Sequence, residues 1–145
     1  MSPLFTLHRI SVGDTGAFGA LVHHTDKGPV VFAATLERTY PTSAEAGISQ
    51  AYNGLTQYVK VQLGIHKCVK RFFVKGGYDT YEIQQDGHTA ILFHKGNIEA
   101  HSEGCVLVAE SFAMIGSQPG IADGSALAEF LNRAGGRAEF DLEVV

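Results

Sequence analysis

The sequence predicts a mainly β protein, a small sandwich or partly closed barrel with one helix near its C-terminal end. Short segments of alternating apolar and polar residues recur along the chain, and glycine-rich turns separate them. Only one segment, near the C-terminal end, has the apolar spacing of a helix. With 145 residues, of which 45% are hydrophobic, the chain is predicted to form a single domain over residues 1–145.

The first third of the chain is predicted to be a meander of antiparallel strands. Residues 4–10 alternate, residues 17–24 are apolar and partly alternating, and residues 29–36 resume the pattern. Residues 13–16 and 25–28 between them contain glycine and short polar side chains, which are typical of turns.

The middle of the chain begins with a polar segment of small residues, 41–58, which we interpret as a long connection. Long loops in compact domains are often functional, for example as lids. Strand patterns return over residues 59–63 and 65–69, with a bend expected at Gly64, and continue over residues 71–74.

Three further strands are expected over residues 78–84, 89–94 and 105–110. The first two are separated by an Asp86-Gly87 pair, which is a strong signal for a β-hairpin. The apolar character of the second and third predicts that they are buried.

The only predicted helix covers residues 122–134 and ends at a pair of glycines. Leu127, Phe130 and Leu131 form its apolar face. Residues 138–144 alternate and are predicted to be the last strand.

Composition argues against several classes of function. The net charge of -4 and the pI of 5.9 argue against a nucleic-acid partner. The sequence has no apolar run long enough to cross a membrane, and its N-terminus has no signal-peptide pattern. We therefore expect a protein made in the cytoplasm, with its site of action open. Of the two cysteines, Cys68 lies in an alternating strand and is expected in the core.

The segment 91–108, ILFHKGNIEAHSEGCVLV, is the strongest candidate for chemistry. His94 ends one predicted strand and Cys105 begins the next, so a hairpin or a neighbouring strand pair would bring them together. A histidine beside a cysteine can generate the thiolate nucleophile. The N–H groups of Gly104 and Cys105 are candidate donors to an oxyanion. Ser102 or a backbone carbonyl is expected to orient the imidazole.

Two other interpretations of this segment stay open. A cysteine at the start of a strand is commonly a small buried hydrophobe, and His94 would then be a hydrogen-bonded residue at a strand end. Alternatively, His94, His101, Glu103 and Cys105 are residue types that bind zinc, although their spacing matches no standard zinc motif. Our prediction is that the protein has no metal and no cofactor.

The Ser-Glu-Gly-Cys-Val segment after a strand-end histidine resembles the signature of L,D-transpeptidase (YkuD-like) catalytic domains. That β-rich family has a Ser-His-Gly-Cys signature, a cysteine acylated by peptidoglycan stem peptides, and an upstream histidine as base. The resemblance implies that Cys105 is the nucleophile and His94 the base. It further implies that Gly104 and Cys105 form the oxyanion hole, and Ser102 and Gly104 match the motif.

The sequence departs from that signature at four points. Glu103 stands where the family has histidine, and Leu107 where an arginine follows the cysteine. Lys95-Gly96 follows His94, and the loop of ten residues between His94 and Cys105 is short for the family. The resemblance therefore supports acyl chemistry at a thiol more than it supports cross-link formation.

A second resemblance covers about 75 residues in four blocks, at positions 35–38, 64–69, 93–97 and 102–108. In order and spacing these blocks are similar to an uncharacterised family, a domain of unknown function that is common in phages and prophages. The resemblance implies a phage context and carries no established activity.

Other residues complete the expected site. Glu37 and Arg38 are neighbours on a strand and point to opposite faces. One interpretation is that both are exposed ions at the strand end. The other is that Arg38 binds a substrate carboxylate and so replaces the arginine that is missing after Cys105. Tyr40 is expected in the same pocket, and Asn97 and His101 are the other expected substrate-binding residues.

Together these observations predict a cysteine-dependent acyl-transfer enzyme that acts on peptidoglycan stem peptides, as a peptidase or transpeptidase. The alternative is a non-enzymatic phage protein, in the virion or bound to a host factor, in which the His/Cys loop is structural or vestigial. The sequence leaves the oligomeric state open.

Overall fold

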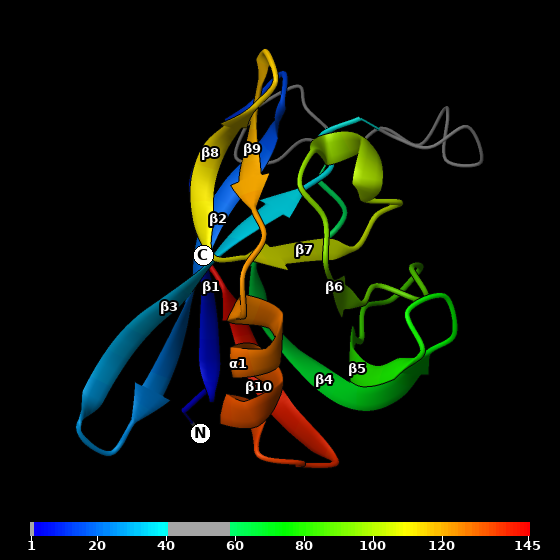
Figure 1. Ribbon diagram of the computed structural model, residues 1–145. Coiled ribbons are helices and arrows are strands. Elements are labelled where there is room, and N and C mark those ends of the chain that lie inside the picture. Colours follow the sequence, from blue (N-terminus) through cyan, green and yellow to red (C-terminus); the bar gives the residue numbers. More distant parts are fainter. Residues whose placement is uncertain (1, 41–58) are drawn as a thin grey trace.

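The computed structural model describes residues 2–40 and 59–145 (Figure 1). The connection predicted over residues 41–58 lies outside the described residues. In the described part of the chain, no helix is long and apolar enough to cross a membrane.

The first three strands form the predicted antiparallel meander. They are β1 (Phe5–Gly13), β2 (Gly16–Thr25) and β3 (Gly28–Glu37), and each is longer than the sequence pattern indicated. Gly16 and Gly28 follow the two turns and adopt φ angles of +134° and +115°. Only glycine takes such angles without strain, which is why the turns fall there.

Eight strands form one sheet in the order β5-β4-β10-β1-β2-β3-β7-β6. Neighbours are antiparallel except for the pairs β1–β10 and β6–β7. The other five strands are β4 (Gly64–Phe73), β5 (Tyr78–Ile83), β6 (Phe93–His94), β7 (Val106–Ala109) and β10 (Glu139–Val144).

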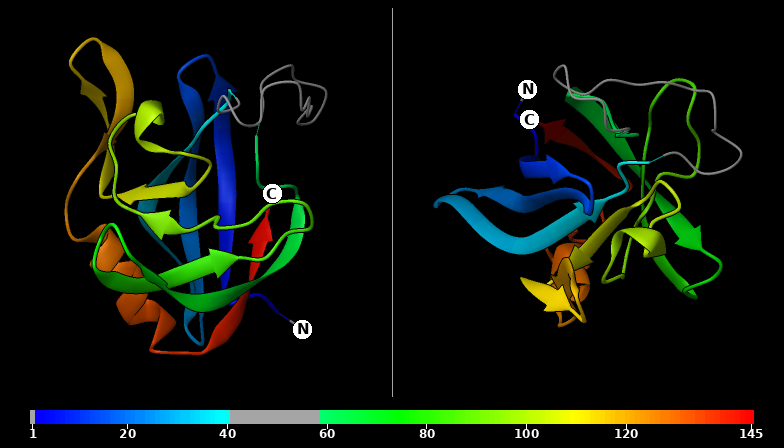
Figure 2. Two further views of the ribbon diagram at one scale, coloured as in Figure 1. Left: turned by 90° about the vertical axis from the view of Figure 1, so that its right-hand side faces the viewer. Right: turned by 90° about the horizontal axis from the view of Figure 1, so that it is seen from above.

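The two ends of this sheet, β5 and the segment leading into β6, lie side by side, so the sheet is nearly closed (Figure 2). The Ile83 N–H donates to the Ile91 carbonyl at 2.8 Å, and the Thr80 hydroxyl donates to the Phe93 carbonyl at 2.7 Å. The predicted fold, a mainly β protein with a partly closed barrel and one helix near the C-terminal end, is confirmed.

Two predicted strands are shorter in the structure. Residues 59–63 are irregular, and β4 begins only at Gly64, whose φ of +118° breaks the extended backbone. Within the strand predicted over residues 89–94, only Phe93 and His94 are in a strand. Ala90 there has a φ of +58°, a left-handed conformation that is incompatible with a continuous strand.

A hairpin that the sequence pattern did not reveal precedes the helix. Its strands are β8 (Ser111–Ile115) and β9 (Gln118–Ala122), and they form a separate two-stranded sheet. Because β9 extends to Ala122, helix α1 covers Ala126–Ala134 and begins four residues later than predicted. It ends as predicted at Gly135, in a left-handed conformation.

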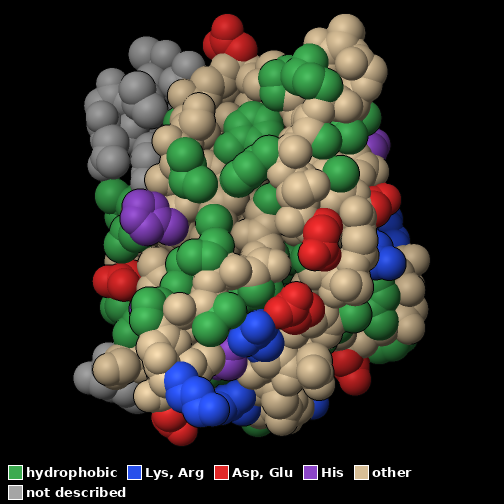
Figure 3. Space-filling view, turned by 60° about the vertical axis from the view of Figure 1, so that its left-hand side comes forward, with side chains coloured by type: hydrophobic (Ala, Val, Ile, Leu, Met, Phe, Trp, Pro, Cys, Tyr) green, Lys and Arg blue, Asp and Glu red, His purple; other side chains and the backbone are tan. Residues whose placement is uncertain are grey.

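The hairpin β8–β9 borders an apolar groove on the outside of the barrel. Figure 3 shows hydrophobic side chains gathered on this face. The groove has a volume of about 540 Å³ and lies between this hairpin and β1–β2, with Ile10, Phe18, Phe112 and Met114 among its lining residues.

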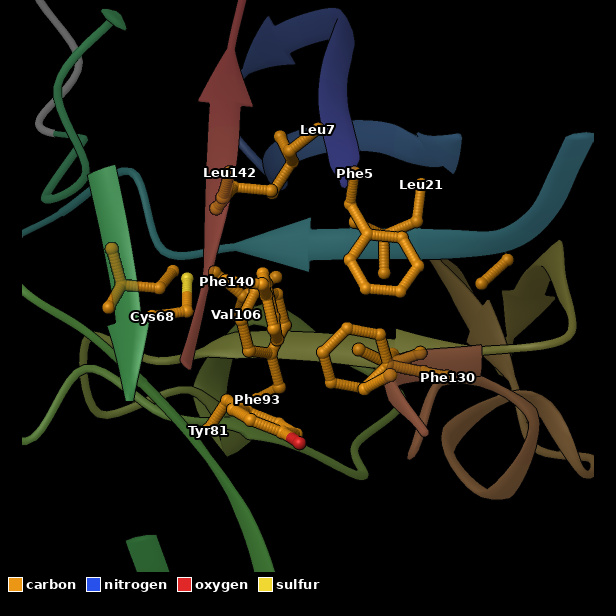
Figure 4. Packing of buried hydrophobic residues seen from close by; sticks show 14 of the residues in the cluster. Phe5, Leu7, Leu21, Cys68, Tyr81, Phe93, Val106, Phe130, Phe140 and Leu142 are labelled. Atoms are coloured by element: carbon orange, nitrogen blue, oxygen red, sulfur yellow. The ribbon is translucent and has the colours of Figure 1, made fainter. Parts of the chain in front are cut away.

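The core is centred on aromatic rings that α1 and the strands bring together (Figure 4). The ring of Phe130, from α1, lies 4.6 Å from that of Phe93 and 5.3 Å from that of Phe5. Cys68 is fully buried in this core, as predicted, and burial raises the pKa of its thiol. An ionised, reactive Cys68 is therefore disfavoured.

A buried ion pair joins β1 to β3. The Arg9 Nε donates to Glu37 Oε2 at 2.8 Å and a terminal nitrogen donates to Oε1 at 2.6 Å, with side chains 2% and 4% exposed. Arg9 also donates to the Val61 carbonyl at 2.6 Å. The expectation that Glu37 is an exposed ion was therefore wrong. Its partner Arg9 is 28 residues away in the sequence, and the pairing depends on how the barrel brings β1 and β3 together.

Candidate active site

A pocket of about 400 Å³ lies between the β4–β5 turn and the crossover from β6 to β7. This crossover contains a short 3-10 helix, η2 (Glu99–His101). The lining residues are Arg71, Phe72, Phe73, Val74, Lys75, Thr89, Ala90, Leu92, His94, His101, Glu103 and Cys105. Both His94 and Cys105 therefore open into one cavity.

β6 ends at His94, and β7 begins directly after Cys105; these two strands are parallel, and this sets the relative position of the two residues. Phe93 pairs with Val106, and His94 pairs with Leu107. Cys105 therefore lies before the ladder and His94 at its far end, and not at the same end as a hairpin would place them. Phe93 and Val106 are fully buried in the core, so the residues next to them, His94 and Cys105, face the opposite side, where the pocket lies.

The Cys105 sulfur forms two hydrogen bonds with backbone groups of the segment of residues 90–92. It accepts a hydrogen bond from the Leu92 N–H at 3.4 Å and donates one to the Ala90 carbonyl at 3.4 Å. The residue is only 9% exposed, and burial raises the pKa of its thiol, against the effects of the Leu92 N–H and of Lys60. The resting group is a neutral thiol.

The His94 ring is held by a stack and by one hydrogen bond. It stacks on Phe73 with 5.1 Å between ring centroids and 19° between planes. Its Nδ1 lies 2.7 Å from the Lys95 carbonyl, which can only accept, so Nδ1 carries the proton and Nε2 has the free lone pair. Burial lowers the pKa of the imidazole, so the ring is neutral. Within the described residues, no hydrogen bond joins it to Cys105.

Ser102 shapes the turn before Cys105. Its buried hydroxyl donates to the Cys105 carbonyl at 2.6 Å and accepts from the Gly104 N–H at 3.2 Å. Of the two expected ways to orient the imidazole, the backbone carbonyl of Lys95 does so and Ser102 does not. The Gly104 amide is occupied by Ser102, whereas the Cys105 N–H has no hydrogen-bond partner among the described residues.

Replacing Ser102 with alanine is expected to lower the free energy of unfolding by about 1–3 kcal/mol, because a buried N–H and a buried carbonyl would lose their partner. Urea unfolding measures this change. The control is Ser111→Ala, at an exposed position of β8, where a change within about 0.5 kcal/mol is expected. Equal effects of the two substitutions would contradict the assigned role of Ser102.

The structure places the four expected substrate-binding residues as follows. His101 lines the pocket, and its Nδ1 accepts the Asn97 N–H at 3.0 Å. Asn97 itself is not among the lining residues, because its side chain donates to the Ile121 carbonyl at 2.9 Å and ties the crossover to β9. Arg38 and Tyr40 also lie outside the lining and pair with each other, with 3.0 Å between Arg38 Nη2 and the Tyr40 hydroxyl.

Several residues of the pocket were not identified from the sequence. Phe73 and Lys75 belong to a segment whose alternation and glycine turn explained it without a function. Lys75 lies 3.6 Å from Glu103 across the pocket, with side chains 76% and 73% exposed. Such an exposed ion pair adds little stability and is easily exchanged for a charged ligand. Ala90 gave no signal in the sequence at all.

The metal interpretation receives no support from the side-chain arrangement. Over residues 2–40 and 59–145, no three His, Cys, Asp or Glu side chains are grouped closely enough to hold a metal ion. His94, His101, Glu103 and Cys105 share a pocket without forming such a group.

Comparisons of the chain with protein families, with curated proteins and with solved structures found no match.

Proposed function

We propose that the protein is a cysteine-dependent acyl-transfer enzyme that acts on peptide amides, with peptidoglycan stem peptides as its substrate. The observation that carries the proposal is the shared pocket, into which a thiol and an imidazole with a free Nε2 both open. The rim pair of Lys75 and Glu103 offers one charge of each sign. Stem peptides carry both carboxylates and amines, which suit such a rim.

The proposed reaction starts from a neutral pair. As the Cys105 sulfur attacks the amide carbon, the thiol proton passes to His94 Nε2 and the carbonyl oxygen becomes an oxyanion. The Cys105 N–H, which has no hydrogen-bond partner among the described residues, is the donor available to that oxyanion. When the C–N bond breaks, His94 returns the proton to the leaving amine. Water or a second amine then releases the acyl group from the thioester.

This mechanism predicts the pH dependence of kcat/KM. The base must be unprotonated, and because burial lowers its pKa from 6.5, the acid limb should lie below pH 6.5. The thiol must be protonated, and because burial raises its pKa from 9.0, the alkaline limb should lie above pH 9.0. A preformed thiolate–imidazolium pair would instead lose activity as the imidazolium deprotonates at alkaline pH, so a fall between these two values would contradict the neutral pair.

Mass spectrometry of the protein mixed with purified muropeptides tests the proposed function. We expect a covalent acyl adduct on Cys105 and a shortened or exchanged stem peptide. Cys68 provides the internal control, because a buried core thiol should remain unmodified. If neither a covalent adduct on Cys105 nor a changed stem peptide is found, the proposed function is wrong.

One observation favours a second candidate, a binding protein without catalysis. The sulfur of Cys105 links the start of β7 to the segment of residues 90–92 through two hydrogen bonds, as a structural thiol would. In that case Cys105→Ala would reduce stability, and muropeptides would bind in the pocket without being changed.

A further inference from the structure

The segment of residues 90–92 provides both hydrogen-bond partners of the Cys105 sulfur. The Ala90 carbonyl accepts from the thiol, and the Leu92 N–H donates to the sulfur. The first contact requires an unusual backbone, because Ala90 has a φ of +58°. Residues other than glycine rarely adopt this conformation, and it persists only where neighbouring groups hold it.

Glu82, on β5, is the side chain that holds Ala90. Its Oε2 accepts the Ala90 N–H at 2.9 Å and also binds the guanidinium of Arg71, from β4. Its Oε1 accepts from the Gln84 amide at 2.9 Å. The carboxylate is therefore fixed by two side chains, and the left-handed residue is attached to a fixed group.

We propose that Glu82 is a positioning residue for Cys105. By binding the Ala90 N–H, it holds Ala90 in the left-handed conformation that directs the Ala90 carbonyl at the thiol, and this contact keeps the sulfur protonated in the resting protein. A carbonyl that accepts the S–H bond stabilises the neutral thiol and disfavours the thiolate. Because alkylation and oxidation require the thiolate, the resting nucleophile is protected from both.

The inference rests on the proposed function for the use of this thiol, although the arrangement is measurable without any substrate. Lys60, Lys75 and Glu103 act on Cys105 electrostatically, and Arg71, His94 and His101 share its pocket. Tyr78 is coupled to Cys105 as well and lies on β5 with Glu82. Arg71 loses its charged partner in Glu82→Gln as it does in Glu82→Ala, so the comparison of these two variants isolates the contact with Ala90.

The test is the rate of iodoacetamide alkylation of Cys105 near neutral pH, in a Cys68→Ala background. In Glu82→Ala the Ala90 carbonyl is released, and the rate should increase about 3- to 10-fold, since a tenfold increase in thiolate corresponds to one unit of pKa. Glu82→Gln keeps an acceptor oxygen for the Ala90 N–H and should stay within about twofold of the parent rate. Ala90→Gly keeps the left-handed backbone without strain and should also match the parent.

Equal rates in Glu82→Ala and the parent would overturn the proposal, as would equal increases in Glu82→Ala and Glu82→Gln. If Glu82→Ala fails to fold, the Raman S–H stretch of the Cys68→Ala protein decides instead. A band shifted to the frequency of a hydrogen-bonded thiol supports the proposal, and a free-thiol band overturns it. None of these measurements uses a substrate. A protein that is inactive on muropeptides would therefore overturn the proposed function without deciding whether Glu82 positions Cys105.

Discussion

Replacing Cys105 with alanine is expected to lower the turnover of peptidoglycan stem peptides by at least about 10³-fold, because without the sulfur no thioester can form. The substitution removes one buried sulfur atom and its two long backbone hydrogen bonds, and this loss of stability is small enough for the protein still to fold. The measurement is the release of product from purified muropeptides, followed by mass spectrometry and compared at equal concentrations of folded protein.

Two further variants make this result specific. Cys68→Ala removes the other thiol of the chain, from the core and away from the pocket, and should leave turnover unchanged. His94→Ala removes the base and should lower turnover about 10²- to 10⁴-fold. Turnover that survives in Cys105→Ala would show that another group is the nucleophile, and the assignment of this site would then be wrong.

Replacing Glu37 with alanine is expected to lower the free energy of unfolding by about 3–5 kcal/mol, because it breaks a buried ion pair and both hydrogen bonds from the Arg9 guanidinium to the carboxylate. The charge cannot reach water, since the Arg9 side chain is only 2% exposed. For a domain of this size that loss is a large part of the total stability, typically about 5–15 kcal/mol. Urea unfolding followed by circular dichroism measures it.

The matched control is an ion pair on the surface of α1. Glu129 and Arg133 form an i,i+4 pair at 2.8 Å with side chains 36% and 25% exposed, and Glu129→Ala should cost about 0.5 kcal/mol or less. The double substitution Arg9→Met with Glu37→Leu should regain part of the loss, because it removes both charges. A cost for Glu37→Ala as small as that for Glu129→Ala would contradict the buried pair.

The sequence pattern predicted the strands that are fixed by local signals and missed those whose local signals are weak. The first three strands followed from alternation and from glycines at the turns, both of which are local properties. The hairpin β8–β9 was missed, because Pro119 and Gly120 lie inside β9 and weaken the strand signal. For the same reason, helix α1 was expected to begin within what is the end of β9.

The members of the candidate site were predictable only in part, because His94, His101 and Cys105 line the pocket and Arg38, Tyr40 and Asn97 do not. The geometry of the site was not predictable. The residue types of His94 and Cys105 and the glycine before the cysteine indicated thiol chemistry. The parallel pairing of β6 with β7 was not predictable, since strands of two and four residues are oriented by tertiary packing. The left-handed Ala90 and its contact with Glu82 likewise depend on β5, which no local pattern connects to the loop.

The position of β10 in the sheet has a consequence for synthesis of the protein on the ribosome. This strand pairs with β1 on one side and with β4 on the other, so it joins the two halves of the barrel. It is also the last described strand to be translated, and β1 must wait until residues 139–144 have been made before its parallel partner emerges. We therefore expect the nascent chain to keep open sheet edges, which bind chaperones or aggregate, until β10 has left the exit tunnel.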